Sequence, residues 1–523
     1  MLSSNFHIIN ASAGSGKTYT LVLLYLKKLL ASESPRPYRH MLALTFTNKA
    51  VNEMKLRILE CLHTLSNPDR KAKSLQEKLM DLLEIDAQEL ARRAEKNLRN
   101  IILEYGSFDI ITLDKFTHRI VRTFAKEFDL PQGFDIALDS STLLDQVVRA
   151  VINQIGSDSF ITSLLLKLSL SKLEQGLSWD IQSDLDEFTA LILSENDRLP
   201  LEDLREKDQR QHNDDRKKLK KALVAADEKI QNLTQKLHEL LEKNTLTAAD
   251  FSRQLLHKHL DLLAEKEYEK CYKNQLEKML SGHIPCYKKT TSSSKKEIID
   301  QLLPQIYSQF LAIKKEVGYF ILLKKTLRYW TPRVLLNQIE RVLNDLQLEK
   351  EVQLLGAFNQ KISKLVQQET APFIYSRIGE RYQHYFIDEF QDTSSLQWSN
   401  LIPLISNSLE SENLRGEKGS LVLVGDPKQA IYRWRGGAIN QFIDLLTEES
   451  RPFQIAPSIN RLETNYRSEE AIVRFNNAFF NNLTKVLSDS TVQSIYGKES
   501  LQQINKPGGY VQLAAVPICK TQD

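Results

Sequence analysis

Residues 6–18 read FHIINASAGSGKT, and this stretch decides the fold class. An apolar run leads into a glycine loop, and an amphipathic segment follows at residues 20–30, which is the order strand, loop, helix. Ala11 occupies the first glycine position of the phosphate-loop pattern G-x-x-x-x-G-K-[ST], and the rest of the pattern is intact. The local alternative is a fortuitous glycine-rich turn. The flanking strand and helix favour a nucleotide-binding loop instead.

The loop residues have distinct expected roles. Gly14 and Gly16 let the backbone amides curl around phosphate oxygens, and the following helix adds its N-terminal dipole. Lys17 supplies a positive charge to the outer phosphates, and the hydroxyl of Thr18 can bind Mg²⁺. The predicted nucleotide-binding residues of this loop are Ala11, Ser12, Ala13, Gly14, Ser15, Gly16, Lys17 and Thr18.

The pattern along the chain predicts an α/β protein with a helical insertion. Further apolar runs of strand length lie at residues 41–46, 109–113, 385–388 and 420–425. Helical patterns separate most of them, which is typical of a parallel α/β sheet. Strands of this kind are missing between about residues 131 and 350, a Leu/Lys/Glu-rich stretch of helical period that is predicted to form an inserted helical domain. A last strand is predicted at residues 510–516.

A heptad pattern lies within the predicted helical domain. Its apolar residues follow alternating steps of four and three, at Leu219, Leu223, Ala226, Ile230, Leu233, Leu237 and Leu240. The pattern predicts a helical hairpin over about residues 206–280 that packs on itself, with residues 256–280 as the second helix. An oligomerising coiled coil is the alternative.

Length and composition exclude several classes of protein. The 523 residues allow three or four domains of ~150 residues each. A hydrophobic fraction of 41% excludes wholesale disorder. With a net charge of +3, affinity for nucleic acid must come from local clusters of Lys and Arg. The four cysteines lie far apart without a C-x-x-C pair, which argues against a disulfide framework, a zinc site or an iron–sulfur cluster. Without a secretion signal or an apolar stretch of ~20 residues, the chain is predicted to be cytoplasmic and not to enter a membrane.

Residues 385–393, which read YFIDEFQDT, provide a second element for phosphate chemistry. Asp388 is predicted to hold Mg²⁺ together with Thr18, and Glu389 to orient and deprotonate the attacking water. Two adjacent acidic residues at a strand end are usually a solvated turn or a helix start. Here, an apolar run feeds directly into the pair in a chain that also has a phosphate loop, which favours nucleotide hydrolysis.

Residues 421–437, which read LVLVGDPKQAIYRWRGG, form the third element. Gln429 lies just after the apolar run, where it could reach a γ-phosphate. Beyond it, rings and guanidinium groups alternate at Tyr432, Arg433, Trp434 and Arg435. Such a set suits stacking on unpaired bases, at ~1–3 kcal/mol per base, while the cations follow the phosphates. Core packing is the alternative for the aromatic residues.

Six segments together resemble superfamily 1 DNA helicases of the UvrD/Rep type, and more closely the RecB/AddA branch. They are residues 11–18, 44–54, 111–116, 387–393, 424–437 and 462–468. The resemblance implies a RecA-like P-loop NTPase core with a large inserted all-helical domain and the start of a second RecA-like domain. The expected boundaries are 1–130 for the first part of the core, 131–350 for the insertion, 351–460 for the second part of the core, and 461–523 for the truncated second domain.

The resemblance also implies residue roles on the DNA side. The expected DNA-binding residues are Phe46, Thr47, Asn48, Thr112, Tyr432, Trp434 and Arg435. Asp114 stands where the family commonly has a histidine, so Thr112 or Lys115 is expected to take over the phosphate contact.

On the nucleotide side, the resemblance implies that Tyr466 stacks on the adenine and that Arg467 reaches the γ-phosphate from the second domain. Gln429 would couple the nucleotide and DNA sites. The local alternative for residues 465–468 is a polar turn before a helix at 469–480. The expected catalytic residues are therefore Lys17, Asp388, Glu389, Gln429 and Arg467.

The function implied by the resemblance is that of an ATP-dependent 3′–5′ DNA helicase or translocase. It would be the motor of a RecB/AddA-type helicase-nuclease in double-strand-break repair and recombination, with ATP and Mg²⁺ as cofactors. Single-stranded or duplex-end DNA and a second subunit of such a complex are the expected partners. The family's later motifs, its arginine finger and its nuclease domain are not found before Asp523, so the chain tested alone is expected to be a weak ATPase. A stand-alone UvrD-like repair helicase, an ATP-binding DNA clamp without motor activity and a small-molecule P-loop kinase are the alternatives.

Overall fold

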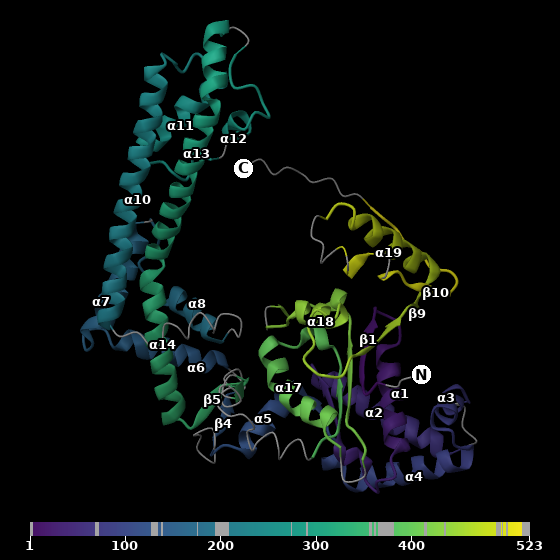
Figure 1. The fold of residues 1–523 in the computed structure, drawn as a ribbon. Coiled ribbons are helices and arrows are strands. Elements are labelled where there is room, and N and C mark those ends of the chain that lie inside the picture. The colour runs from purple at the N-terminus through teal and green to yellow at the C-terminus, as the bar shows by residue number, and fades with distance from the viewer. Residues whose placement is uncertain are drawn as a thin grey trace. The chain divides into compact units, whose positions relative to one another are not determined.

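The chain forms two compact units in the computed structural model (Figure 1). The sheet unit contains residues 1–140, 193–197 and 347–523, and the helical unit contains residues 141–192 and 198–346. The structure describes residues 4–67, 73–126, 134–137, 140–174, 176–193, 209–272, 275–288, 291–354, 358–359, 362–363, 381–412, 416–433, 436–487, 493, 495–497 and 500–514.

A six-stranded parallel sheet forms the centre of the sheet unit. Its strand order is β3-β2-β6-β7-β1-β8. The strands are β1 (Phe6–Ala11), β2 (Met41–Thr45), β3 (Ile110–Thr112), β6 (His384–Ile387), β7 (Ser420–Gly425) and β8 (Ser458–Leu462). The five strand predictions in this sheet are confirmed, whereas β8 was not predicted. Because all strands are parallel, the residues that follow their carboxyl ends lie along one edge of the sheet.

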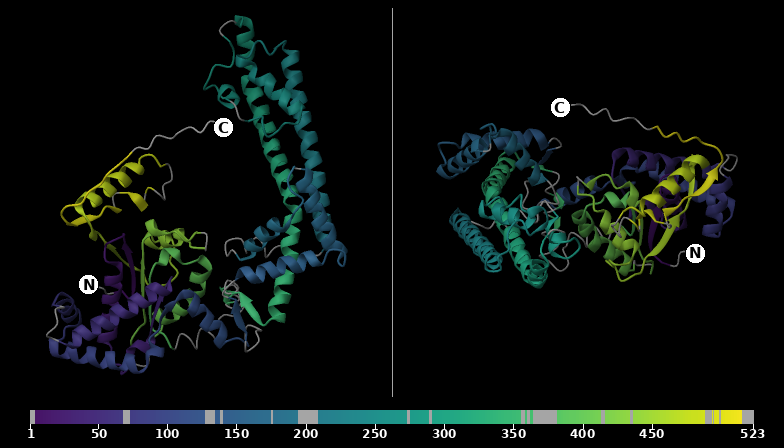
Figure 2. Two further views of the ribbon diagram at one scale, coloured as in Figure 1. Left: turned by 180° about the vertical axis from the view of Figure 1, so that it is seen from behind. Right: turned by 90° about the horizontal axis from the view of Figure 1, so that it is seen from above.

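Helices cover both faces of the sheet (Figures 1 and 2). Consecutive strand residues point to opposite faces, so Ile8 joins one hydrophobic core and Ile9 the other. The first core includes residues of α5 (Leu113–Thr123), α17 (Ser395–Glu410) and α18 (Ile439–Leu446). The second includes residues of α1 (Lys17–Ala31), α2 (Asn48–Ser66), α3 (Lys73–Leu83) and α4 (Ala87–Leu103). Burial on both faces explains why the strands read as apolar runs without alternation.

Short 3₁₀ turns connect several of these elements. They are η1 (Pro37–His40), η2 (Tyr105–Ser107), η4 (Phe390–Asp392) and η5 (Pro427–Gln429). Two of them lie at the carboxyl edge of the sheet: η4 begins two residues beyond Asp388, which follows β6, and η5 begins just after Asp426, which follows β7. Their short, tight geometry therefore sets the direction of the residues predicted to perform phosphate chemistry.

A second, two-stranded parallel sheet begins one residue after β8. It contains β9 (Thr464–Glu469) and β10 (Gln503–Lys506), with α19 (Glu470–Leu483) between them in the chain. Glu463 alone separates β8 from β9, and its carbonyl accepts the backbone amide of Gln503 at 2.8 Å. The chain therefore passes from the large sheet to the small one at a single residue.

Two strand predictions are wrong. A short parallel pair joins β4 (Asp135–Ala137) to β5 (Val352–Leu354), although no strand was expected between residues 131 and 350. Three residues are too few to show a hydrophobic period, and the partner is remote in sequence. Residues 510–514 form no strand, and the side chains of Tyr510 and Leu513 are exposed. The last two residues of that prediction, 515 and 516, lie outside the described residues.

The helical unit is dominated by two long antiparallel helices, α10 (Gln209–Lys243) and α13 (Ser293–Arg328). The shorter elements are α6 (Ser140–Asn153), α7 (Ser159–Glu174), α8 (Gln182–Leu193), η3 (Ser252–Gln254), α11 (Leu255–Ala264), α12 (Leu276–Leu280) and α14 (Trp330–Glu349). The predicted heptad helix exists as α10, and its Ile230 and Leu237 are buried. The predicted hairpin is only partly correct. Residues 256–280 hold two short helices, α11 and α12, in place of one long helix, and α11 does pack on α10, but α13 packs along α10 far more extensively. Among the described residues, no helix is both long and apolar enough to cross a membrane.

Candidate nucleotide-binding and catalytic site

The glycine loop lies between β1 and the amino end of α1. Gly14 and Gly16 have φ angles of +79° and +87°, a conformation that glycine adopts without steric cost. The backbone amide and the hydroxyl of Ser15 donate to the carbonyl of Ser12 at 3.1 and 2.7 Å, which closes the loop. Lys17 is the first residue of α1 and Thr18 the second. The loop and the helix dipole therefore have the arrangement that binds anions.

The ammonium of Lys17 joins the ends of two other strands. Its Nζ lies 3.0 Å from Oε2 and 3.2 Å from Oε1 of Glu389, and it donates to Oε1 of Gln429 at 3.1 Å. Only 12% of the Lys17 side chain is exposed. Three residues predicted from separate motifs are thus in direct contact.

Two buried residues that the sequence analysis did not select complete this contact as a closed ring. Gln391 donates from Nε2 to Oε2 of Glu389 at 2.8 Å and accepts the backbone amide of Asp426 on Oε1 at 3.0 Å. Asp426 in turn accepts Nε2 of Gln429 on Oδ2 at 2.6 Å. Gln391 and Asp426 are each 1% exposed. This ring therefore fixes the relative positions of three strand ends. Its members, in order, are Lys17, Glu389, Gln391, Asp426 and Gln429.

Asp388 and Glu389 leave β6 in different conformations. The backbone amide of Asp388 continues the sheet by donating to the carbonyl of Leu44 at 2.9 Å. Glu389 then has a φ of +52°, a left-handed conformation that costs a residue with a Cβ about 1–3 kcal/mol. Burial, followed by the charge of Glu389, raises the pKa of Asp388 to about 6. A nearby cation would favour the ionised form of this buried carboxyl.

A third carboxyl, that of Asp392, belongs to the same cluster. Burial and the charge of Glu389 raise the pKa of Asp392 to about 6 as well. The backbone amides of Ile431 and Tyr432 donate to it, so it links the turn after β6 to the loop after β7.

The donor set at this edge fits Mg²⁺ bound through a nucleotide. In the described part of the chain, no group of three or more His, Cys, Asp or Glu residues is arranged to hold a metal alone. Mg²⁺ in nucleotide sites commonly uses one or two protein oxygens, with phosphates and water supplying the rest. The hydroxyl of Thr18 and the buried carboxyl of Asp388 are ligands of that kind.

Residues of β9, together with Gln502 just before β10, cover the glycine loop. The backbone amide of Tyr466 donates to the carbonyl of Gly14 at 2.9 Å, and Nε2 of Gln502 donates to the carbonyl of Ala13 at 2.9 Å. A Cβ placed on Gly14 would lie 2.7 Å from Oδ1 of Asn465 and 2.9 Å from Cβ of Arg467. Residues 465–468 belong to strand β9, so the alternative of a polar turn is wrong. Tyr466 remains 54% exposed.

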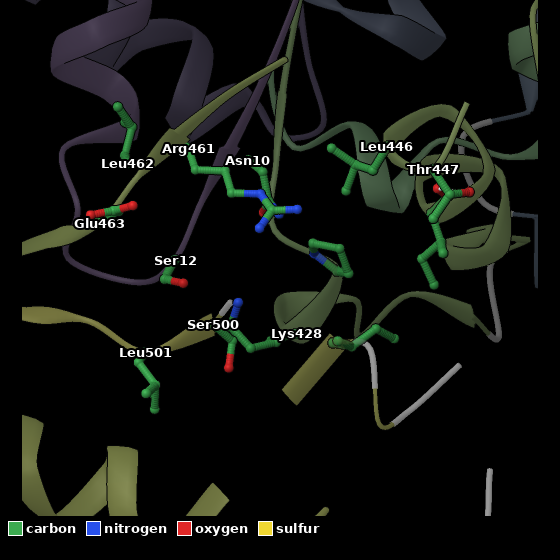
Figure 3. A pocket seen from close by; sticks show the side chains of 13 residues that line it. Asn10, Ser12, Lys428, Leu446, Thr447, Arg461, Leu462, Glu463, Ser500 and Leu501 are labelled. Atoms are coloured by element: carbon green, nitrogen blue, oxygen red, sulfur yellow. Dashed lines mark hydrogen bonds between the residues drawn. The ribbon is translucent and has the colours of Figure 1, made fainter. Parts of the chain in front are cut away.

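A cavity of about 100 Å³ adjoins the loop at the junction between the two sheets (Figure 3). Its polar lining includes Asn10, Ser12, Lys428, Arg461, Glu463 and Ser500. In Figure 3 these side chains surround the space between the end of β1 and the segment near residue 500. Ser12 belongs both to the cavity and to the glycine loop, so a group held here would touch the loop.

The residues expected to contact DNA have mixed environments. The rings of Phe46 and Tyr432 lie 4.4 Å apart at 34°, which joins the segments after β2 and β7. Thr47 accepts the backbone amide of Ala50 and caps α2, whose first residue is Asn48. Thr112 is buried and caps α5 through the amide of Lys115 at 3.2 Å. Trp434 and Arg435 lie outside the described residues.

Comparison with known proteins agrees with these motifs. The chain matches the family model of the UvrD/REP helicase N-terminal domain over residues 2–281 and 220–449. It is 24% identical over 507 residues to the RecBCD enzyme subunit RecB of Chlamydia pneumoniae, covering 92% of this chain and 42% of the relative. It is 23% identical over 520 residues to the ATP-dependent helicase/nuclease AddA of Clostridium novyi, covering 94% and 39%.

A third relative matches over a shorter region. DNA helicase II of Haemophilus influenzae is 35% identical over 114 residues, which is 22% of this chain and 14% of the relative. The chain thus spans about two fifths of the length of the RecB and AddA relatives. Because the family model covers most of its residues, the chain belongs to the UvrD/Rep helicase family.

Proposed function

We propose that this chain is the nucleotide-binding portion of an ATP-dependent 3′–5′ DNA helicase or translocase. The proposed whole protein is the motor of a RecB/AddA-type helicase-nuclease that acts in double-strand-break repair with a second subunit. The observation that carries the proposal is the hydrogen-bonded ring through Lys17, Glu389 and Gln429, because it unites a phosphate loop with a candidate base and a candidate γ-phosphate sensor.

The proposed domains follow the boundaries expected from the resemblance. Residues 1–130 and 351–460 would form the RecA-like core, residues 131–350 the helical insertion, and residues 461–523 the start of the second RecA-like domain. The division of the chain near residues 140 and 347 supports the insertion. The single-residue passage from β8 to β9 at Glu463 supports the last boundary.

In the proposed mechanism, Lys17 exchanges partners when nucleotide binds. Its ammonium would leave Glu389 and Gln429 for the outer phosphates, while the amides around Gly14 and Gly16 bind phosphate oxygens. Thr18 and Asp388 would hold Mg²⁺, which supplies positive charge to the phosphates. Glu389, released from Lys17, would accept the proton of the attacking water. Arg467 would approach the γ-phosphate, and Tyr466 would stack on the adenine.

The same loop connects hydrolysis to the proposed DNA path. Gln429 contacts Lys17, and Tyr432, three residues later, packs against Phe46. A movement of Gln429 on nucleotide binding would therefore shift the Phe46–Tyr432 pair. This pair, with Thr47, Asn48, Thr112, Trp434 and Arg435, is proposed to bind single-stranded DNA.

A stand-alone UvrD-like repair helicase is the second candidate. The relatives named RecB and AddA match more than nine tenths of this chain, whereas DNA helicase II matches 22%. This difference in coverage supports the RecB/AddA branch.

Hydrolysis of ATP with and without a single-stranded oligonucleotide tests the proposal. We expect weak hydrolysis by the 523-residue chain that rises on addition of DNA. The substitution Tyr432→Ala should remove the stimulation but keep basal hydrolysis, while Tyr319→Ala, at a tyrosine that is 47% exposed on α13, should leave both unchanged. A kinase would show no stimulation, and a clamp would bind ATP and DNA without hydrolysis. Either result would refute the motor.

A further inference from the structure

A second polar cavity lies within the helical unit and is lined by residues of three helices. Its volume is about 130 Å³, several times the ~15 Å³ that one water molecule needs. Helix α7 contributes Ser163 and Lys167, helix α10 contributes His212 and Arg216, and helix α14 contributes Trp330 and Thr331. None of the motifs described above includes these residues.

The cavity carries positive charge that other residues do not neutralise. Lys172, Lys217 and Lys218 each pair with an aspartate in the helical unit. Lys167 and Arg216 form no such ion pair within the described residues. The buried Nε of Arg216 also has no hydrogen-bond partner there. A guanidinium with an unused buried donor is a strong site for an anion, because leaving such a donor unsatisfied costs free energy.

The rest of the lining is neutral and rich in donors. Hydroxyls come from Ser159, Ser163 and Thr331, and no Asp or Glu lines the cavity. Three carboxylates lie next to lining residues in sequence, and each has a partner of its own. Oδ1 of Asp158 accepts the amides of Phe160 and Ile161 at 2.7 and 3.0 Å. Asp214 and Asp215 pair with Lys217 and Lys218. The cavity therefore offers cations and hydroxyls without a competing acidic group.

One wall of the cavity is aromatic and held in place. The ring of Trp330 is 7% exposed and meets the ring of His212 edge-on, with centroids 6.2 Å apart. The guanidinium of Arg333 lies 5.9 Å from the Trp330 ring centroid and adds a further positive charge nearby. A buried aromatic wall beside two cations leaves room for a compact anionic group.

We propose that this cavity binds one phosphate group, with Arg216 and Lys167 as its charged ligands and Ser163 and Thr331 as hydroxyl donors. Guanidinium and hydroxyl donors together match the tetrahedral oxygens of phosphate. The phosphate comes from a nucleic-acid backbone or from a free phosphate compound. The backbone source rests on the proposed function, whereas phosphate binding itself does not.

The backbone source is tested by the salt dependence of DNA affinity. The binding constant of the full chain for a DNA oligonucleotide is measured between about 50 and 200 mM salt. The logarithm of this constant falls linearly with the logarithm of the salt concentration, and the steepness of this line decreases by about one for each phosphate contact that a substitution removes. Arg216→Ala and Lys167→Ala should each reduce the slope by about one. Lys218→Ala, at a residue 80% exposed on the same helix, is the matched control and should keep the wild-type slope. Lys167 is itself exposed, so its variant remains informative if Arg216→Ala fails to fold.

Inorganic phosphate tests the site without DNA. The measurement uses Lys17→Ala as background, so that the glycine loop does not contribute, and replaces chloride by phosphate at constant ionic strength. Phosphate should raise the melting temperature of this background and of its Lys218→Ala derivative, but not of the Arg216→Ala or Lys167→Ala derivatives. A response to phosphate without a change in the DNA slope would support the site and overturn the backbone source. No difference between the Arg216, Lys167 and Lys218 variants in either measurement would overturn the proposal, even if DNA still stimulates hydrolysis.

Discussion

The substitution Gln391→Glu replaces one NH₂ group by oxygen at the centre of the buried ring. The oxygen that accepts the amide of Asp426 is kept, but the new oxygen faces Oε2 of Glu389 at 2.8 Å and Oδ2 of Asp392 at 3.4 Å. Two unit charges 4 Å apart repel by about 4 kcal/mol at an effective dielectric constant of about 20, which corresponds to about three pKa units. The introduced carboxyl should therefore have a pKa above about 7 in the folded protein and stay protonated.

The magnitude follows from the pKa difference between the folded and unfolded states. A glutamic acid in the unfolded chain has a pKa of about 4.3, and each pKa unit corresponds to about 1.36 kcal/mol. Keeping the introduced carboxyl protonated in the folded protein therefore lowers the free energy of unfolding by about 4 kcal/mol at about pH 7. Because the folded pKa is raised, stability is retained below about pH 4.3 and lost as the pH rises toward the folded pKa. At about pH 5 the cost should be only about 1 kcal/mol.

The assay compares melting temperatures near pH 5 and pH 8, together with hydrogen exchange of the Asp426 amide. At the higher pH, Gln391→Glu should lower the melting temperature of the sheet unit by on the order of 10 °C and expose the Asp426 amide to exchange. Gln235→Glu is a matched control, because Gln235 also donates to a glutamate, Glu239 at 3.0 Å, but on an exposed helix face. Gln235→Glu should lower the free energy of unfolding by only a few tenths of a kcal/mol. Equal, pH-independent effects of the two substitutions would refute the buried ring.

Three further predictions concern the nucleotide site. Binding of Mg²⁺-ATP should weaken as the pH falls below about 6, because Asp388 becomes protonated there and a neutral carboxyl is a poor metal ligand; nucleotide titrations at pH 5 and 7.5 check this. Glu389→Gln should keep ATP binding and slow hydrolysis by about 10²–10⁴-fold, as expected for loss of a general base, and single-turnover hydrolysis measures it. Gly14→Ala and Gly16→Ala both place a Cβ at positive φ, but only the former collides with Asn465. Gly14→Ala should therefore increase exchange of amides in residues 464–469 more than Gly16→Ala does, and equal exchange would contradict the observed cover over the loop.

The local patterns predicted much of the sheet unit, because buried parallel strands and the glycine loop have strong local signals. The strand β8 was missed because its residues are half-exposed at the sheet edge and carry Asn460 and Arg461, which break the apolar run. The main partner of the heptad helix, α13, was not identified, because a heptad shows which face is apolar but not which helix covers most of it.

Part of the candidate site could also be predicted from the sequence. Lys17, Glu389 and Gln429 were found because each lies in a recognisable motif. Gln391 and Gln502 were not, because their roles come from hydrogen bonds to residues remote in sequence, Asp426 and Ala13. Gln391 lies inside a motif already selected, and only the distance to Asp426 distinguishes it from a surface glutamine.

Binding of a fluorescent ATP analogue with Mg²⁺ tests the central claim most directly. Wild type and Lys96→Ala, which removes an exposed lysine on α4, should bind the analogue saturably and with equal affinity. Lys17→Ala should bind it at least tenfold more weakly, since the ammonium at the meeting point of three strand ends is lost. Equal affinity of the two lysine variants would contradict the assignment of this edge of the sheet as an ATP site.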